Sequence, residues 1–518
     1  MKFLLVAINS KYIHTNPAVY SLKNSVIGCP GIDIVVREFT INQTISDIMA
    51  SIYEEKPDYI GFSCYIWNIS MVKILIQNIN KILPEVKLFL GGPEVSFHSD
   101  TVIKDMNVSA IMVGEGEETF KELINVLPEN SSELTNTILA EVAGLQTSDG
   151  YTKNREPISL DSITYNKDDM DDNKILYYES SRGCPFRCSY CLSSIDKSLR
   201  FRSVELVKKD LDMFLSAKVK QVKFIDRTFN ANKNHALQIW KHIQEHDNGI
   251  TNFHFEIAAD LLSMEQLNVI QAMRPGLIQL EIGVQTTNLK TLNAINRMTD
   301  LVKLREAVKT LLSFNNTHIH LDLIAGLPYE DYDSFVDSFN NVFNMKPHNL
   351  QLGFLKVLKG TEMEEKVSAY EIKYMSEPPY EVLSTKWISY EDILELKGVE
   401  EMLETYYNSG QYTCALPLLL TKYSSPYSMF KSLSDYYILK NYTTKTPARS
   451  RRYEILIEFA KENLGPEFAE EIREALTMDY YLREKPKSKP DFVKSIPDLS
   501  KIDYNTKNPI TGNVRFTQ

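Results

Sequence analysis

Short apolar runs alternate with helical stretches through the first part of the chain. The runs lie at residues 2–8, 33–39, 59–64, 86–92 and 110–116. Strands separated by helices are joined by right-handed crossovers, which produce a parallel sheet covered on both faces. The pattern therefore predicts an α/β domain over residues 1–125, whose ligands bind beyond the carboxyl ends of the strands.

A second alternating series begins after residues 126–172, where the pattern weakens and which predict a connector; the run at 161–174 is polar and acidic. The further apolar runs lie at residues 175–180, 222–227, 253–260, 277–285, 318–326 and 349–357. Six strand–helix units predict a partial barrel of TIM type over residues 173–375, with its chemistry at the carboxyl ends of the strands. Residues 376–518 carry helical patterns and predict a mostly helical domain.

The expected fold class is therefore α/β: a Rossmann-like (flavodoxin-like) domain, a partial (β/α)6 barrel and a helical C-terminal domain. A chain of 518 residues with 43% hydrophobic residues can bury several cores. The net charge of −11 gives no general attraction for phosphate backbones, which makes nucleic acid an unlikely partner. We find no signal peptide and no apolar stretch of bilayer length, and we expect a cytoplasmic protein without a membrane span.

Three of the six cysteines fall within eight residues, in the segment SRGCPFRCSYC that directly follows a predicted strand. Cys184, Cys188 and Cys191 can therefore direct three sulfurs from one loop towards one point, and thiolates are the ligands of iron–sulfur clusters. A zinc site would need a fourth ligand, but no histidine lies between Cys184 and His235. Three ligands on a [4Fe–4S] cluster leave one iron open, as S-adenosylmethionine (SAM) chemistry requires.

CxxxCxxC with Tyr190 before the third cysteine resembles the radical SAM superfamily, over roughly residues 170–360. The resemblance implies a SAM site at the barrel mouth, with contacts from strand-end residues. Glu256 and Asp260 are candidates for the ribose hydroxyls, while Asp226 beside Arg227 also fits an ordinary ion pair. The implied SAM-binding residues are Tyr190, Asp226, Asn230, Glu256, Asp260, Glu281, Gln285 and Asp322.

The N-terminal domain resembles the cobalamin-binding domain of cobalamin-dependent radical enzymes. Its paired small residues after two strands would let the nucleotide tail of a corrinoid approach closely. The implied cobalamin-binding residues are Ser63, Tyr65, Asn68, Gly91, Gly92, Pro93, Glu94, Gly114, Glu115 and Gly116. The common Asp-x-His-x-x-Gly signature is absent and His14 is the one histidine in the first loop, which leaves the lower ligand of cobalt unassigned. A flavodoxin-like domain kept for packing or for substrate binding is the alternative.

The combined resemblance implies an anaerobic radical SAM methyltransferase that moves a methyl group from methylcobalamin to an unactivated carbon. The same cofactors also support a radical rearrangement, cyclisation or ring contraction, and a cobalamin and iron–sulfur redox sensor without turnover is a third hypothesis. A small-molecule or peptide substrate is expected, and flavodoxin or ferredoxin is expected to reduce the cluster. Nothing in the chain names the substrate or the role of the C-terminal domain.

Overall fold

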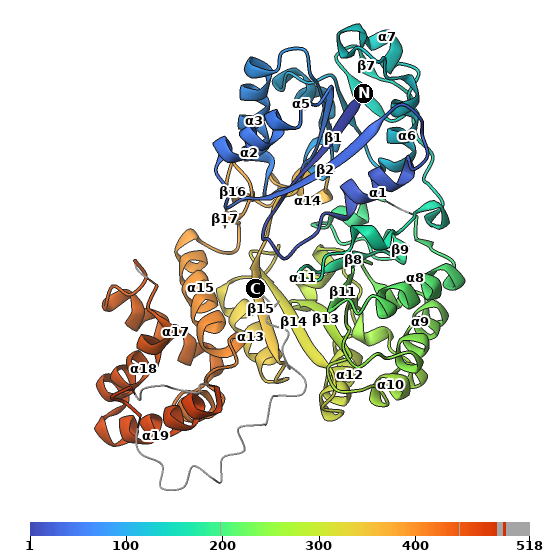
Figure 1. Ribbon diagram of the computed structural model, residues 1–518. Helices are drawn as coiled ribbons and strands as arrows, with labels where there is room; N and C mark the ends of the chain where they lie inside the picture. Colours follow the sequence, from blue (N-terminus) through green and yellow to red (C-terminus); the bar gives the residue numbers. More distant parts are fainter. Residues whose placement is uncertain (197, 445, 484–489, 494–518) are drawn as a thin grey trace.

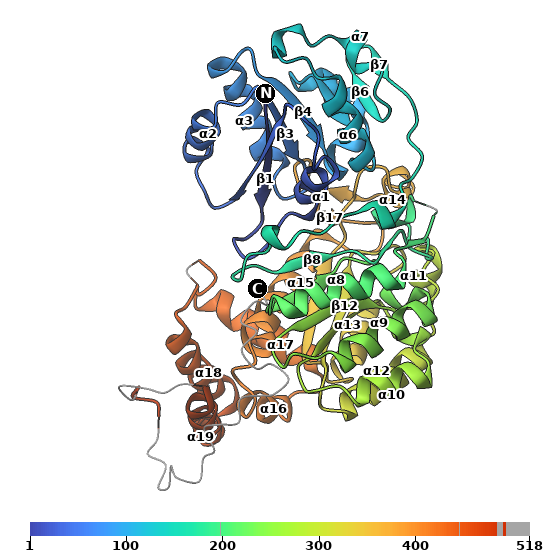
Figure 2. The same ribbon diagram turned by 45° about the vertical axis from the view of Figure 1, so that its right-hand side comes forward.

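The computed structural model describes residues 1–196, 198–444, 446–483 and 490–493. Figures 1 and 2 show a helix-flanked sheet at the N-terminal end, a curved sheet of barrel type beside it, and a group of helices along one side of the curved sheet. Every helix in the described part of the chain is too short or too polar to cross a bilayer.

The first sheet has seven strands in the order β2-β1-β3-β4-β5-β6-β7. Their bounds are β1 Lys2–Asn9, β2 Asp33–Thr40, β3 Tyr59–Ser63, β4 Lys87–Gly91, β5 Ala110–Met112, β6 Leu145–Thr147 and β7 Gly150–Tyr151. The first five are parallel, as their apolar runs predict. β6 and β7 add antiparallel strands at the edge, so part of the segment expected as a connector extends this sheet.

Helices cover both faces of this sheet because side chains of successive strand residues point to opposite faces. Phe3 and Leu5 of β1 belong to the core under one set of helices, and Leu4 and Val6 to the core under the other. The first set is α1 Pro17–Ser25, α6 Glu117–Val126 and α7 Asn136–Leu139. The second is α2 Ile45–Glu54, α3 Ile69–Ile82 and α5 Ser99–Asp105, with the single turn α4 Pro93–Ser96 after β4.

The barrel sheet has six parallel strands in the order β15-β14-β13-β12-β11-β8. Their bounds are β8 Leu176–Tyr178, β11 Gln221–Phe224, β12 Asn252–Ile257, β13 Ile278–Gln285, β14 His318–Ala325 and β15 Asn349–Phe354. The helices between them are α8 Val204–Ser216, α9 Lys233–Glu245, α10 Met264–Gln271, α11 Leu289–Ala294, α12 Leu301–Ser313 and α13 Tyr332–Phe343. The order of elements confirms the expected α/β fold with a partial barrel.

Short elements lie in the loops of the first domain, of the barrel and of the segment between them. They comprise the hairpins β9 Ser181–Arg182 with β10 Arg200–Phe201 and β16 Lys373–Tyr374 with β17 Val382–Ser384, and the helix α14 Glu362–Glu365. The 3-10 turns are η1 Ser131–Glu133, η2 Leu160–Ser162, η3 Lys167–Asp169, η4 Leu192–Ser194, η5 Phe229–Ala231 and η6 Ala259–Leu261.

The C-terminal helices complete the core of the barrel. They are α15 Tyr390–Leu403, continued by the π-helical turn η7 Glu404–Asn408, then α16 Ala415–Leu420, α17 Pro426–Leu439, α18 Arg449–Leu464 and α19 Pro466–Arg483. α15 packs on β15, and α17 packs on α13. One continuous group of buried side chains runs from the barrel into these helices. This core crosses the division expected near residue 375. The domain boundaries expected from sequence remain a prediction.

Candidate active site

The three clustered cysteines lie on the loop that follows the first barrel strand, β8. Cys184 and Cys188 are buried, Cys191 is half-buried, and all are free thiols. Burial raises the pKa of the Cys188 thiol, and negative charge at Cys191 and Cys184 raises this pKa as well. The positive charge of Arg297 acts in the opposite direction. The three sulfurs are therefore close enough to influence one another, as ligands of one metal centre must be.

A buried carboxylate holds the start of this loop. Asp226, at the end of β11, accepts hydrogen bonds from the backbone N–H of Ser180 at 2.9 Å and from the hydroxyls of Ser180 and Ser181 at 2.6 Å each. Burial raises its pKa to about 6. Asn230 is held in a similar way, because its amide donates to the carbonyl of Ala258 and accepts from the N–H of Ala258. Both side chains are fully buried and fasten loops.

Three carboxylates meet on the inner wall of the barrel. Glu256 of β12 lies opposite Glu281 of β13 in the strand register, and Asp322 of β14 lies opposite Gly283. Three basic side chains of the wall lie beside these carboxylates. Lys223 Nζ is 3.2 Å and His254 Nε2 is 2.9 Å from Glu281 Oε2, and His320 Nε2 is 3.1 Å from Asp322 Oδ1.

The members of this wall differ in their protonation. Burial and, to a lesser extent, the charge of Glu281 raise the pKa of Glu256 to about 7. Glu281 is also buried, but its hydrogen bond from His254 and the charge of Lys223 hold its pKa well below the ordinary value. Burial raises the pKa of Asp322. At neutral pH the wall therefore offers a firmly ionised carboxylate next to one that gains and loses a proton.

Two unpaired polar atoms lie beside the cysteine loop. Oε1 of Gln285 and Nε of Arg297 are buried and have no hydrogen-bond partner in the described part of the chain. Arg297 reaches from the loop after α11 to the carbonyl of Gly283 and to Cys188 Sγ, which is 3.7 Å from its Nη1. A side chain at Gly283 would collide with the amide of Gln285. Buried polar groups are normally satisfied, so these atoms fit a site for a polar ligand.

A cavity of about 780 Å³ lies between the first domain and the barrel. On the first domain it reaches from Leu5 and Gly61 of the sheet to the turns after β4 and β5. On the barrel side its wall includes Leu192, Ile195 and Asp196, which directly follow Cys191. The cavity thus connects the carboxyl ends of the first sheet with the cysteine loop.

A group of ion pairs joins the two domains at the edge of this cavity. Arg182, next to the cysteine loop, lies 2.9 Å from Glu117 and 3.2 Å from Glu115 of the first domain, and 2.7 Å from Glu179 of the barrel. Arg200 also pairs with Glu115. Although burial opposes it, pairing with Arg200 and Arg182 lowers the pKa of Glu115. These side chains are mostly buried, so the pairs fix the position of one domain on the other.

Comparison with known protein families assigns each part of the chain. A B12 binding domain matches residues 4–124, and the radical SAM superfamily matches residues 178–342. The chain belongs to the cobalamin-binding radical SAM family. A protein family of unknown function, DUF4080, matches residues 368–513, which include the C-terminal helices. The two domain assignments confirm the predicted cofactors: a [4Fe–4S] cluster, SAM and cobalamin.

Relatives within this family include named methyltransferases. The chain is 28% identical over 308 residues to an uncharacterized methyltransferase of Pyrococcus horikoshii, covering 55% of this chain and 64% of that protein. It is 23% identical to the cobalamin-dependent radical SAM methyltransferase TokK of Streptomyces tokunonensis, covering 63% and 51%. The chain thus spans about half to two thirds of the length of these relatives. The fold matches the cobalamin-dependent SAM radical enzyme OxsB with a TM-score of 0.63 at 16% identity, over 92% of this chain and 78% of that one.

The residues present fit the cofactors of the family. Three thiols on one loop supply a cluster with all but one of its usual four ligands. Gly92 has a φ of +112°, and a Cβ there would lie 2.5 Å from the carbonyl oxygen of Cys64. Only glycine therefore permits this turn in the cavity wall. The cavity and the unpaired atoms of Gln285 and Arg297 provide space and polar partners for ligands.

The structure divides the predicted SAM-binding residues into two groups. Tyr190, Glu256, Glu281, Gln285 and Asp322 lie at the cysteine loop or on the inner wall of the barrel. Asp226 and Asn230 form the second group: backbone and serine groups use their polar atoms, and a contact with SAM stays a prediction for both. Asp260 belongs to neither group. It is half-buried and accepts a hydrogen bond from the N–H of Asp300 at 3.1 Å.

The predicted cobalamin-binding residues divide similarly. Those in the cavity wall are Ser63, Tyr65, Gly91, Gly92, Pro93, Gly114, Glu115 and Gly116. Asn68 lies behind the wall, where its amide donates to the carbonyls of Ile8 and Ser63. Glu94 is also buried and accepts a hydrogen bond from Tyr380 at 2.9 Å. For these two residues, a contact with cobalamin stays a prediction.

His14 does not lie in the wall of the cavity. Its Nδ1 is 2.6 Å from the hydroxyl of Tyr177 on β8, and burial lowers its pKa. The side chain thus connects the first loop to the barrel. The structure offers no reason to assign His14 to cobalt.

The sequence analysis missed several residues of the site. Arg182 and Arg200 gave no signal, because Glu115 and Glu117, their partners in the first domain, are distant in the sequence. The sequence did carry a signal for Lys223, His254 and His320. Polar residues at every second position, as in FHFE (253–256) and HIHLD (318–322), mark the inner face of a strand. Arg297 stands in a loop after α11, and its contact with Cys188 follows only from the fold.

Proposed function

We propose that this protein transfers a methyl group to an unactivated carbon of a small-molecule or peptide substrate, using cobalamin, SAM and a [4Fe–4S] cluster. The observation that carries the proposal is the cavity that touches both the glycine turns of the first domain and the residues after Cys191. The names of the relatives from Pyrococcus and Streptomyces favour methyl transfer.

In this proposal the inner wall and the cavity have separate tasks. Cys184, Cys188 and Cys191 hold the cluster and leave one iron for SAM. Tyr190, Glu256, Glu281, Gln285 and Asp322 bind and orient SAM, and Asp260 contributes from the edge of the site. Cobalamin occupies the cavity, against Ser63, Tyr65, Gly91, Gly92, Pro93, Gly114, Glu115 and Gly116.

When bound, the reduced cluster supplies the electron that cleaves SAM, and cobalamin supplies the methyl group. The chain contributes placement and exclusion of water. The ion pairs of Arg182 keep the two domains together. The stacked rings of Tyr65 and Trp67, whose centroids are 4.4 Å apart, provide a flat apolar surface at the first domain. A fixed separation between two bound cofactors is what a transfer between them requires.

We also propose that the protein works without oxygen in the cytoplasm and receives electrons from flavodoxin or ferredoxin. The support for this compartment is that all six cysteines, which lie in the described part of the chain, are free thiols. Free thiols are typical of reducing compartments.

Cofactor content gives the first test. Protein purified without oxygen and reconstituted with iron, sulfide and hydroxocobalamin should hold about four irons and one cobalt per chain. A Cys184→Ala/Cys188→Ala/Cys191→Ala variant should lose the iron and keep the cobalt. Iron without cobalt in the unmodified protein would leave methyl transfer without its carrier and overturn the proposal.

Product analysis separates methyl transfer from the other reactions of the family. Reduced protein with SAM should form both 5′-deoxyadenosine and S-adenosylhomocysteine, and with substrate a product heavier by one methylene. Deoxyadenosine without S-adenosylhomocysteine would instead favour a rearrangement, cyclisation or ring contraction. Failure to cleave SAM when fully reduced would favour a redox sensor.

A further inference from the structure

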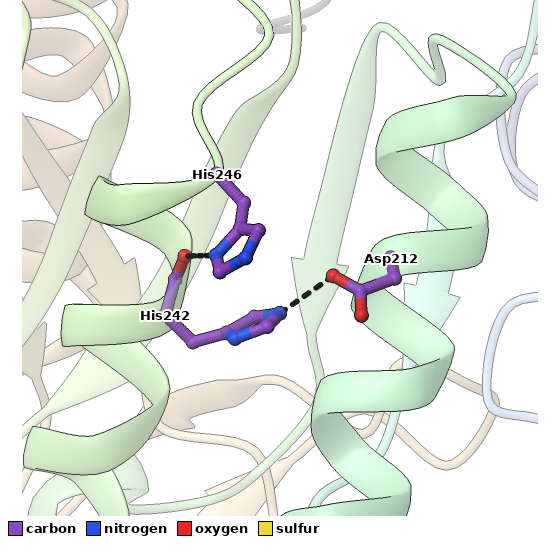
Figure 3. Close-up of side chains that lie close together, drawn as sticks. All are labelled: Asp212, His242 and His246. Atoms are coloured by element: carbon purple, nitrogen blue, oxygen red, sulfur yellow. Dashed lines mark hydrogen bonds and ion pairs between the residues drawn. The ribbon is translucent and has the colours of Figure 1, made fainter.

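Two histidines and an aspartate converge on the outer surface of the barrel, between α8 and α9. His242 and His246 lie four residues apart, at the end of α9, and Asp212 faces them from α8 (Figure 3). One possible ligand atom from each lies within 4.8 Å of the other two. His242 Nε2 is 2.7 Å from Asp212 Oδ1. The two imidazole rings are stacked, with centroids 4.1 Å apart.

One hydrogen bond prepares His246 to bind a cation. Nδ1 of His246 lies 3.0 Å from the carbonyl oxygen of His242, to which it can only donate. This bond places the proton of a neutral imidazole on Nδ1 and leaves the lone pair of Nε2 free. Metal-binding histidines typically donate their second ring nitrogen in this way. The hydrogen bond between His242 and Asp212 does not by itself require a second imidazole, but His246 lies beside it.

We propose that Asp212, His242 and His246 form a binding site for one divalent transition-metal ion, with Zn²⁺ as the best fit. Two imidazoles and a carboxylate are ordinary zinc ligands, and a water would complete the tetrahedron. Ligands of one zinc lie about 3.3 Å apart. On binding the ion, the group contracts, the His246 ring turns out of its stack on His242, and His242 Nε2 exchanges its proton and its bond to Asp212 for the metal. His242 is the fixed member, with 9% of its side chain exposed, and the more exposed Asp212, with 53%, has room to shift as the ion binds.

The site would join two helices that support the cysteine loop. α8 follows β10, which pairs with β9 just before Cys184. The same helix carries Asp210, whose carboxylate accepts hydrogen bonds from Tyr178 and Arg202 at 2.9 Å each. A metal ion held between α8 and α9 therefore stabilises the outer side of the barrel beneath the cluster. The site uses none of the groups assigned to the cofactors.

Zinc binding to the cluster-loaded protein tests the proposal. Without oxygen, the protein is titrated with Zn²⁺ against a coloured chelator of known affinity. We expect one Zn²⁺ per chain, with affinity reduced at least about tenfold in His246→Ala and in Asp212→Asn. His98→Ala is the matched control, since His98 is an exposed histidine that pairs with Glu364 in another part of the chain, and it should bind as the unmodified protein does.

Two outcomes would overturn the proposal. One is no uptake of Zn²⁺ by the unmodified protein in competition with the chelator. The other is unchanged affinity in His246→Ala. Loss of binding in the Cys184→Ala/Cys188→Ala/Cys191→Ala variant would then place the zinc on the cysteines. As a second measure, Zn²⁺ should raise the thermal unfolding midpoint of the unmodified protein and leave that of His246→Ala unchanged, because a ligand stabilises only the state that binds it. His246 is exposed, so this variant should fold.

Discussion

Replacement of Asp226 should loosen the iron–sulfur cluster although this side chain touches no cofactor in our proposal. Asp226→Ala removes the acceptor of three hydrogen bonds at the base of the cysteine loop. The hydroxyl of Ser180 can turn to His235 Nε2, 3.2 Å away. The N–H of Ser180 and the hydroxyl of Ser181 are buried and lose their partner.

An unsatisfied buried donor costs about 1–3 kcal/mol, so two of them destabilise the closed loop by roughly 2–6 kcal/mol. At 1.4 kcal/mol per factor of ten, the opened loop becomes at least about 30-fold more populated. The assay is the rate at which a chelator removes iron from the reconstituted protein without oxygen. Asp226→Ala should release iron at least about 30-fold faster, and a rate equal to that of the unmodified protein would refute the reasoning.

Asp226→Asn is the matched control, because its amide can still bond to both serines, and its release rate should stay within a few-fold of the original.

The rates of iron release from the unmodified protein and from Asp226→Asn should depend differently on pH. The pKa of Asp226 in the folded protein, about 6, is above its ordinary value of 3.8. Its contribution to stability is therefore complete below pH 3.8 and is lost as the pH rises through about 6. Between pH 5 and 7.5, iron release from the unmodified protein should accelerate up to about tenfold relative to Asp226→Asn.

Three further replacements test other parts of the site. Gly92→Ala forces a Cβ to 2.5 Å from the carbonyl oxygen of Cys64, and cobalt analysis should show loss of cobalamin with iron retained. Glu256 has a pKa of about 7, so SAM binding measured by equilibrium dialysis should strengthen from pH 6 to pH 8 as the carboxylate ionises. Equal pH dependence in Glu256→Gln would contradict this assignment. Arg182→Met leaves the partly buried carboxylates of Glu117 and Glu179 without their cation, which costs about 3–5 kcal/mol. Cobalamin should therefore dissociate faster from this variant. An unchanged dissociation rate would show that these pairs do not hold the domains together.

The sequence carried strong signals for long regular elements and for the cluster. Parallel strands buried on both faces read as apolar runs, and three cysteines so close together on one loop are typical of a metal centre. β6 and β7 were missed because strands of three and two residues are too short to show a period. The shared core of barrel and C-terminal helices was missed because a helical pattern shows which face is apolar but does not name the partner of that face.

The roles of the polar site residues were harder to predict from the sequence than their positions. Strand-end residues such as Asp226 and Glu256 look alike in the sequence, since both follow apolar runs. Their roles differ because loops from other parts of the chain reach Asp226 and use its oxygens, while Glu256 faces the interior of the barrel. Hydrogen-bond partners that are distant in the sequence decide such roles, and no local pattern records them.

The core that the barrel shares with the C-terminal helices affects how the chain can fold during synthesis. The first domain has its own cores on both faces of its sheet, and these use residues before about 145. It can fold while the ribosome is still making the barrel. The apolar surfaces of β15 and α13 stay uncovered until α15 and α17 emerge, more than thirty residues after β15 ends. The nascent barrel therefore passes through a stage in which it is exposed to aggregation, and removal of the C-terminal helices would make that stage permanent.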